Sequence, residues 1–470
     1  MAPLPSVPPH MLPGRESTIH ALLHFPLPIQ SYGRPPPIRA DALTAAFVTT
    51  EPSCTDLQHI TTIEVPVAKL LDRMIKTAEK AVVNGAKAMK ILHATTDETV
   101  PLWILPYWQG VGAAREKKDL WLGVERFLLR EHNPWTRERP ARAPVAAVMR
   151  AALELLYPRR EDEMLQGFPD PQPIGRLSTF ASEDWLSTWH MDLQLALLRE
   201  ELARSGNHEV HVASAYMYKC IIAAFKDKER YDEAHHQAVF RLGTRLVLQS
   251  LDLASAANVD DNHWIVFAIM RGEKTVYYGD ATAAAFHPQF VLVMNWWIDF
   301  HLAREFVWSR MMVTKQVDGF SCGILGGNAL RHFYAGQAYP LAIGGARGAD
   351  AERADVLLRV LLHDRPIFSI LTSLLKSARS RATTSSDCPD ASRVPPAATL
   401  ALEAEITAVL QLGPETRATT YQINLGLATV ARAVKICPVR GRQEIARHPH
   451  RPACIGGHAA RELALSTSLE

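Results

Sequence analysis

The sequence lacks several features that mark specialised classes of protein. No uninterrupted apolar run reaches about 20 residues, the length that a membrane-spanning helix needs, so we expect no membrane segment. No basic segment followed by an apolar one opens the chain, so we expect no secretory signal. The formal net charge is only +2, which gives no reason to expect nucleic acid or a membrane surface as a partner.

Cysteine is scarce, with six residues in a chain of 470, and no two have the close spacing of a zinc knuckle or a redox pair. Thinly spread cysteine is typical of a reducing compartment, so we expect an intracellular protein. The C-terminal region contains Cys437, Cys454 and three histidines, but their spacing fits no standard zinc motif. We therefore predict no metal site and no cofactor.

What is present is typical of a globular protein, with 47% apolar and 21% charged residues. Its length allows two or three domains. Ten of the 31 prolines fall in residues 1–40, and beyond about residue 377 the sequence is rich in Ser, Thr, Ala and Pro and then in Arg and His. The expected segments are a disordered proline-rich arm at 1–60, a helical module of unknown role at 61–166, a mixed domain at 176–345, a C-terminal helix packed on that domain at 346–376, and a mostly disordered tail at 377–470.

The mixed domain combines helical and strand patterns. Apolar residues at helical spacing predict helices over Glu183–Ala203 and Gly323–Tyr334. Residues 271–274 have the composition of a tight turn between two strands. The predicted strands are Val210–Val212, Leu246–Leu253, His263–Met270, Thr275–Tyr278 and Phe306–Val313. Short strands and helices without a regular alternation predict an α+β fold.

Three short clusters in this domain contain the parts of a thiol protease. Cys322 directly precedes a predicted helix, and a helix N-terminus favours the negative charge of an attacking thiolate. His263 opens one predicted strand and Asp280 follows the next, so a hairpin would place both at one edge, where the carboxylate orients the imidazole. Gln316, six residues before Cys322, could donate an amide hydrogen to an oxyanion.

The order His-Trp, then Asp, then Gln-x5-Cys-Gly resembles the catalytic signature of the ubiquitin-like (SUMO) protease family, which is related to the adenoviral protease, adenain. The resemblance covers about 170 of the 470 residues. It implies a papain-like α+β fold and cysteine-type peptidase activity. It also implies that Cys322 is the nucleophile, His263 the base, Asp280 the third member of the triad and Gln316 the oxyanion donor.

The same resemblance implies how a substrate is held. Trp264 and Trp185 would cover a narrow tunnel for the C-terminal glycines of a ubiquitin-like modifier. The implied partner is such a modifier, or a protein conjugated to it, and no cofactor is needed. The family suggests a nuclear or cytoplasmic monomer.

Two alternatives remain open at this stage. One is a protease-like binding module whose active site has decayed, in a copy carried by a fungal mobile element. It is favoured by Ser187-Thr188, where the family often has Asn-Asp, and by Gly326 and Gly327 inside the predicted helix, since glycine costs about 1 kcal/mol there. The other is a peptidase for a polypeptide that is not a modifier.

Overall fold

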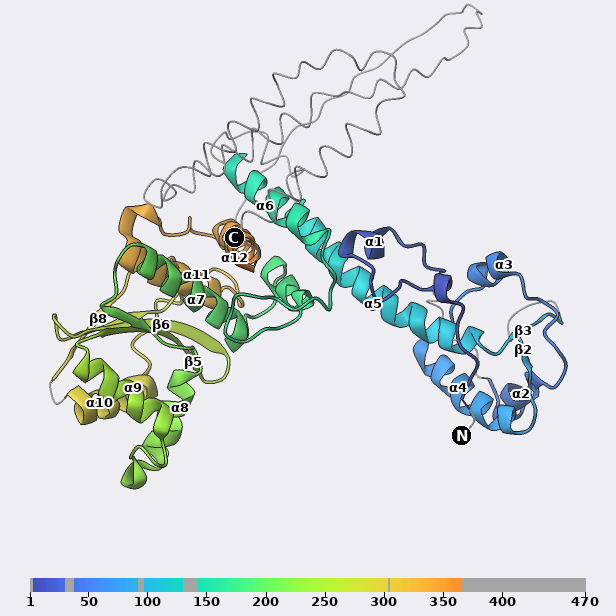
Figure 1. Cartoon of the computed structure of the whole chain (residues 1–470), viewed down its shortest axis with the longest axis horizontal. Helices are drawn as coiled ribbons and strands as arrows, with labels where there is room; N and C mark the ends of the chain where they lie inside the picture. The colour runs from blue at the N-terminus through green and yellow to red at the C-terminus, as the bar shows by residue number, and fades with distance from the viewer. Residues whose placement is uncertain (1–2, 30–37, 92–96, 130–142, 303–304, 365–470) are drawn as a thin grey trace, which may run out of the picture. The chain divides into compact units, whose positions relative to one another are not determined.

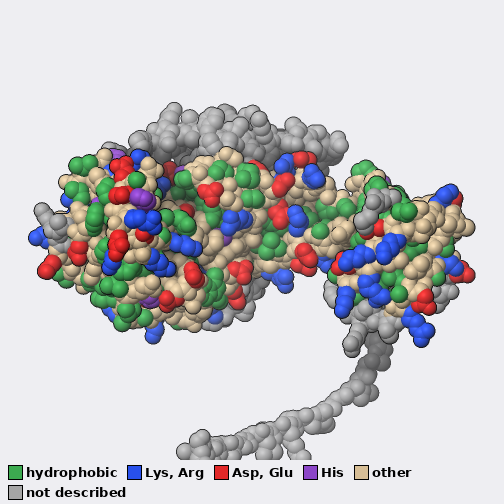
Figure 2. Space-filling model, turned by 90° about the horizontal axis from the view of Figure 1, so that it is seen from below, with side chains coloured by type: hydrophobic (Ala, Val, Ile, Leu, Met, Phe, Trp, Pro, Cys, Tyr) green, Lys and Arg blue, Asp and Glu red, His purple; other side chains and the backbone are tan. Residues whose placement is uncertain are grey.

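The computed structural model describes residues 3–29, 38–91, 97–129, 143–302 and 305–364 (Figure 1). The predicted tail at 377–470 lies outside these residues, as do residues 365–376 of the predicted C-terminal helix and the tail cysteines and histidines. Among the residues that the structure describes, no helix combines the length and the apolar character that crossing a bilayer requires. Figure 2 shows acidic and basic side chains mixed across one face of the molecule.

The N-terminal part contains a small sheet and several helices, most of which pack around one apolar core. Its antiparallel sheet has the order β1-β2-β3, with Phe47 opposite Met89 and Met89 opposite Val100. The elements are η1 (Pro9–Met11), α1 (Ile19–His24), α2 (Ala40–Ala45), β1 (Phe47–Val48), α3 (Leu57–Thr62), α4 (Ala68–Val83), β2 (Ala88–Lys90), β3 (Thr99–Pro101) and α5 (Ile104–Leu128).

The second part is built on a five-stranded mixed sheet of order β4-β5-β6-β7-β8. The three central strands are antiparallel, and the outer strands β4 and β8 run parallel to their neighbours. Its elements are α6 (Ala143–Leu156), η4 (Ile174–Ala181), α7 (Thr188–Arg204), β4 (Val210–Val212), α8 (Met217–Lys226), η5 (Lys228–Arg230), α9 (Gln237–Leu248), β5 (Asp252–Val259), β6 (His263–Met270), β7 (Thr275–Gly279), α10 (Pro288–Leu302), β8 (Val307–Arg310), α11 (Cys322–Ala335), η6 (Gly336–Ala338) and α12 (Ala346–Asp364).

Helices cover both faces of this sheet, α7 and α11 on one side and α8, α9 and α10 on the other (Figure 1). Strand β6 is apolar after His263 because its side chains alternate between two cores. Trp264, Val266 and Ala268 pack with α7 and α11, whereas Ile265 and Phe267 pack with α8 and α10. A strand buried on both faces reads as a continuous apolar run, which is why β6 was predictable from the sequence. The fold is α+β, as expected.

The predicted disordered arm at 1–60 is wrong for the residues that the structure describes there. Helices α1 and α2 and strand β1 lie in this segment, and α3 begins in it. Met11, Leu43 and Ile60 are buried in the N-terminal core, and Ile19 is buried in the core that α7 and α11 share. The prolines obscured an apolar pattern of short helices, each too brief to show the helical period over several turns.

The predicted strand Leu246–Leu253 is also wrong over its first half. Residues up to Leu248 belong to helix α9, whose buried face contains Val239, Gly243 and Leu246. Ser250 has a φ of 55°, in the left-handed region, and this turn separates the helix from β5. The apolar run therefore spans two elements, since periodicity over so few residues does not distinguish helix from strand.

The predicted helical module at 61–166 contributes to two cores. Leu70, Met74 and Trp108 belong to the N-terminal core. Trp121 from the second half of α5 and Leu153 from α6 instead belong to the core that contains α7 and α11. The long helix α5 therefore takes part in both cores, and α6 is part of the packing behind the candidate site.

Candidate active site

His263 and Asp280 lie together at one end of the β6–β7 hairpin. The strands are antiparallel with Val266 opposite Gly279, so the first residue of β6 and the residue after β7 reach the same edge. Nε2 of His263 is 2.8 Å from Oδ1 of Asp280. The side chain of Asp280 is nearly buried and that of His263 is about one-fifth exposed, at 4% and 21%.

The charges around His263 favour its protonated form. The hydrogen bond with Asp280, followed by the effect of the Cys322 thiol, raises the pKa of His263 to about 9, although burial opposes the shift. Asp280 bonds the imidazole directly, and the Cys322 thiol is near enough to raise its pKa. An imidazole between a carboxylate and a thiol can hold the thiolate as an ion pair and later donate a proton.

Asp280 is fixed by more than the histidine. Its Oδ1 accepts hydrogen bonds from the Thr282 backbone N–H at 2.8 Å and from the Thr282 hydroxyl at 2.7 Å. The Tyr278 hydroxyl donates to Oδ2 at 3.4 Å. Burial raises the pKa of Asp280, but the hydrogen bonds from His263 and Thr282 outweigh it and lower the pKa below its ordinary value. The carboxylate is therefore charged and oriented at neutral pH.

Cys322 is the first residue of α11 and is buried. The turn before it is organised by Asp318, whose Oδ1 accepts from the backbone N–H groups of Phe320 at 2.9 Å and Ser321 at 2.8 Å. Its Oδ2 accepts from the Ser321 hydroxyl at 2.8 Å. The thiol thus lies in the first helical turn, where unpaired N–H groups favour a negative charge.

The glycines of α11 allow the helix to lie close to its neighbours. A Cβ on Gly326 would come within 3.1 Å of Val266 Cγ1 on β6. A Cβ on Gly327 would overlap the amide of Gln194 on α7. Close approach therefore accounts for Gly326 and Gly327, which the sequence offered as a sign of decay.

Gln316 lies near the pair but its amide has a partner within its own loop. Its backbone N–H donates to Ala281 O at 2.8 Å, which places it beside the residue after Asp280. Its Nε2 donates to Asp318 O at 2.6 Å, and its Oε1 is buried without a hydrogen-bond partner among the described residues. The side chain is within the site, and its role as oxyanion donor stays a prediction.

The two tryptophans occupy different environments. Trp264 is buried, and its indole N–H donates to Leu186 O at 2.6 Å. A Cβ on Gly323 would lie 3.2 Å from Trp264 Cδ1, so the ring packs against the start of α11. Trp185, next to Leu186, is 47% exposed. Trp264 therefore anchors the segment that presents Trp185 to solvent.

Sequence reasoning missed Arg353 on α12, which is fully buried beside the site. Its guanidinium donates to Thr179 O and Asp184 O at 2.9 Å each and to Phe320 O at 3.2 Å. Burial lowers the pKa of Arg353, partly offset by nearby acidic groups and by Cys322. The sequence did indicate that Arg353 is buried, because it shares a helical face with the apolar residues three, four and seven positions later. A buried charge at such a position needs hydrogen-bond partners.

No protein-family model matches the chain, and no curated protein matches its sequence. Its structure is similar in part to solved SUMO proteases. The Chaetomium thermophilum Ulp1-like SUMO protease catalytic domain is 13% identical, with a TM-score of 0.37, over 46% of this chain and 88% of that one. The SUMO protease Ulp1 with its catalytic cysteine oxidised to a sulfenic acid is 16% identical, with a TM-score of 0.35, over 46% and 93%.

The Xanthomonas campestris effector protein XopD bound to ubiquitin is 22% identical, with a TM-score of 0.26, over 37% of this chain and 91% of that one. Similarity at these TM-scores carries no argument about activity. The case for a function rests on the side chains at the end of the β6–β7 hairpin.

Proposed function

We propose that this chain is a cysteine peptidase that cleaves after the C-terminal glycine of a ubiquitin-like modifier. One observation carries the proposal. Nε2 of His263 lies 2.8 Å from a buried, charged Asp280, and Cys322, the first residue of a helix, helps to raise the pKa of the same imidazole. A nucleophile, a base and an orienting carboxylate in this relation are the parts of thiol-dependent acyl transfer.

The reaction follows from these positions. The Cys322 sulfur attacks the carbonyl carbon of the glycine, and His263 donates its proton to the leaving amine, so that a thioester and a free amine form. His263 then takes a proton from water, the hydroxide attacks the thioester, and the thiolate leaves as the carboxylate product forms. In this scheme Asp280 holds the imidazole in place, and Gln316 donates to the oxyanion after its amide turns from Asp318.

The surroundings of the site suit a polypeptide substrate. Trp185 is 47% exposed, and Met312 and Val317, on the segment that carries Gln316, are 70% and 65% exposed. Exposed apolar side chains near a nucleophile are suited to holding an extended chain. The resemblance to the ubiquitin-like proteases implies a narrow tunnel to the nucleophile. Glycine at the cleaved position would fit such a tunnel, and a residue with a larger side chain would not.

The test is covalent capture with a panel of ubiquitin-like modifiers, each with an electrophile at its C-terminus. We expect an adduct with one modifier or a few, detected by mass and mapped to Cys322. Cys322→Ala should remove the adduct and Cys220→Ala should not, because Cys220 lies on α8 beneath the opposite face of the sheet. Thermal melts of both variants show whether each remains folded.

Each other result points to a different function. Binding of a modifier without an adduct would favour a decayed binding module. Hydrolysis of an unrelated peptide that depends on Cys322, with no modifier captured, would favour a peptidase for another polypeptide. Retained hydrolysis in folded Cys322→Ala would refute the assignment of the nucleophile.

A further inference from the structure

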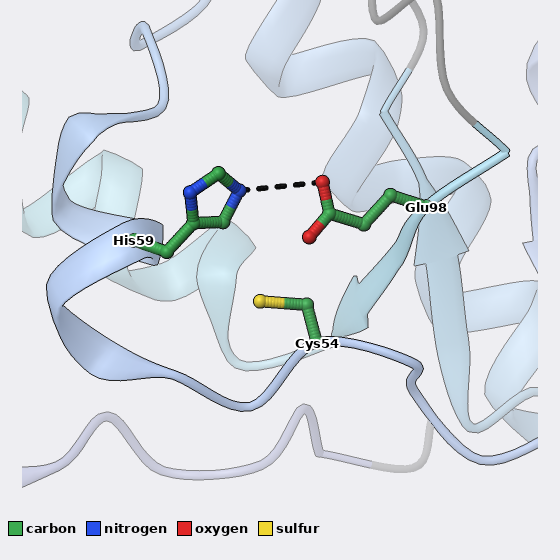
Figure 3. A group of neighbouring side chains, drawn as sticks. All are labelled: Cys54, His59 and Glu98. Atoms are coloured by element: carbon green, nitrogen blue, oxygen red, sulfur yellow. Dashed lines mark hydrogen bonds and ion pairs between the residues drawn. The ribbon is translucent and has the colours of Figure 1, made fainter.

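A second group of reactive side chains lies in the N-terminal part, unrelated to the candidate active site. Cys54, His59 and Glu98 come from a loop, from helix α3 and from the residue before strand β3, and they point toward one another (Figure 3). One donor atom from each lies within 4.8 Å of the others. His59 Nε2 and Glu98 Oε2 are 3.3 Å apart.

We propose that Cys54, His59 and Glu98 bind a divalent zinc ion. A thiolate, an imidazole and a carboxylate are the three kinds of side chain that bind Zn²⁺ in proteins. In tetrahedral coordination with bonds of roughly 2.0–2.3 Å, donor atoms lie about 3–4 Å apart. The His59–Glu98 separation already meets this spacing, so the cluster needs only a small adjustment.

The donor set also fits zinc in charge and exposure. The thiolate and the carboxylate together neutralise a divalent cation. Cys54 and Glu98 are partly buried, whereas the His59 side chain is 47% exposed. Three protein ligands at a partly open surface leave the fourth coordination position to water.

The backbone around two of the ligands is held by hydrogen bonds of its own. The Cys54 N–H donates to Thr99 O at 3.0 Å, and the Ser53 N–H donates to Thr99 Oγ1 at 2.9 Å. The Thr99 N–H returns a bond to Ser53 Oγ at 3.0 Å. These hydrogen bonds hold the loop that contains Cys54 beside β3, so the side chains of Cys54 and Glu98 lie close together without the metal. Such supporting contacts orient ligands and raise metal affinity.

The third ligand is placed by a helix cap. Asp56 is the N-cap of α3, and its side chain accepts from the Gln58 backbone N–H at 3.0 Å. The cap fixes where α3 begins and thereby turns His59 toward Glu98. Metal binding would join the loop, α3 and the segment leading into β3, which already meet through hydrogen bonds and the N-terminal apolar core.

The cluster is not arranged as a second nucleophilic site. Burial and the neighbouring carboxylate of Glu98 raise the pKa of the Cys54 thiol. An activated cysteine instead needs a cationic neighbour that favours the thiolate. A bound metal ion would instead favour the thiolate of Cys54, because it displaces the thiol proton to solvent and binds the sulfur and the carboxylate at once.

The experiment uses full-length protein, reduced and stripped of metal with a chelator. Cobalt(II) is the spectroscopic probe, and zinc affinity is measured by calorimetry. We expect the visible bands of tetrahedral cobalt with a thiolate-to-cobalt charge-transfer band, both displaced by zinc. Zinc should also raise the midpoint of thermal unfolding, because it binds the folded state.

Variants assign the site. Cys54→Ala should remove the charge-transfer band, and His59→Ala and Glu98→Gln should each weaken zinc binding at least tenfold. Cys220→Ala and Cys322→Ala should bind as the wild type does. A charge-transfer band that persists in Cys54→Ala, or unchanged zinc affinity in His59→Ala, would overturn the proposal. The His59 side chain is about half exposed, so replacing it disturbs the core little, and its variant tests the site even if Cys54→Ala does not fold.

Discussion

At the scale of single residues, the His263–Asp280 pair makes the sharpest prediction about activity. The carboxylate is the largest cause of the raised pKa of His263, about 9 against an ordinary 6.5. Asp280→Asn should therefore move the alkaline limb of the kcat/KM profile from near pH 9 toward pH 6.5. It should also lower kcat/KM at neutral pH by about 10²- to 10⁴-fold, the contribution of general acid–base catalysis. The measurement is a pH–rate profile for hydrolysis of a substrate made from the modifier that the capture experiment identifies.

A matched control separates this effect from a general loss of charge. Asp299 is an exposed carboxylate on α10, so Asp299→Asn makes the same chemical change away from the pair. We expect its profile to match that of the wild type. An alkaline limb that stays near pH 9 in Asp280→Asn would show that the carboxylate does not set the pKa of His263.

The same pair makes stability depend on pH. The pKa of His263 is raised on folding, so its contribution is complete below pH 6.5 and is lost as the pH rises through about 9. The pKa of Asp280 is lowered, so its contribution is present above 3.8 and is lost as the pH falls. We expect the stability difference between wild type and His263→Gln to be largest between pH 5 and 6.5 and to shrink through pH 9. Denaturant melts across this range measure it, and a difference that grows at alkaline pH would contradict the pairing.

At the scale of elements, the packing of α11 predicts that alanine at Gly323 lowers stability. A Cβ on Gly323 would lie 3.0 Å from Met191 Sδ and 3.2 Å from Trp264 Cδ1. Overpacking costs about 1–3 kcal/mol, and at the second residue of α11 alanine gains less than the roughly 1 kcal/mol that it adds in a helix interior. Gly323→Ala should therefore lower the free energy of unfolding by about 1 kcal/mol and reduce turnover, since the residue adjoins Cys322.

Gly319 offers the comparison, because a Cβ there would meet nothing within 4 Å. Gly319→Ala should change stability by less than about 0.5 kcal/mol, as surface changes usually do. Chemical denaturation of both variants measures the change in the free energy of unfolding that each substitution causes. Equal stability of the two would mean that α11 does not pack as closely on β6 and α7 as described.

Arg353 predicts that α12 positions the nucleophile. Its three hydrogen bonds join Thr179 O, Asp184 O and Phe320 O, and the last of these lies two residues before Cys322. Arg353→Met should slow labelling of Cys322 by a small thiol reagent about tenfold and lower stability by about 1–3 kcal/mol, because buried carbonyls lose their donor.

Arg353→Lys should restore part of the labelling rate, since it keeps the charge but not the fork of donors. Arg204→Met, on the exposed end of α7, should leave the labelling rate unchanged. A stability loss in Arg353→Met without any change in labelling would limit Arg353 to a structural role.

At the scale of the whole molecule, the core behind the site extends past the boundaries predicted from the sequence. Trp121 and Leu153, before residue 176, and Leu357 and Val360, after residue 345, belong to the same core as Cys322. A fragment of residues 176–345 should therefore not fold cooperatively, whereas residues 3–364 should. Circular dichroism and thermal melts of the two fragments test this. A cooperative transition of the shorter fragment near that of the longer one would contradict it.

Some of this protein was determined by the sequence alone. The β6–β7 hairpin follows from two apolar runs around a short turn, and α11 follows from its helical spacing. These features are local, because neighbouring residues decide them. The order of His263, Asp280 and Cys322 was visible for the same reason, since each stands at the end of a predictable strand or the start of a predictable helix.

Only the tertiary structure decided the rest. Cys54 and Glu98 are 44 positions apart, and no spacing rule joins them with His59 until β3 and α3 pack together. Arg353 reaches carbonyls up to 174 positions away. Packing of distant segments sets such contacts, and a single sequence records local preference without recording which segments meet. The glycines of α11 show the difference, because the sequence indicates their cost in a helix and the fold supplies the close contact that requires them.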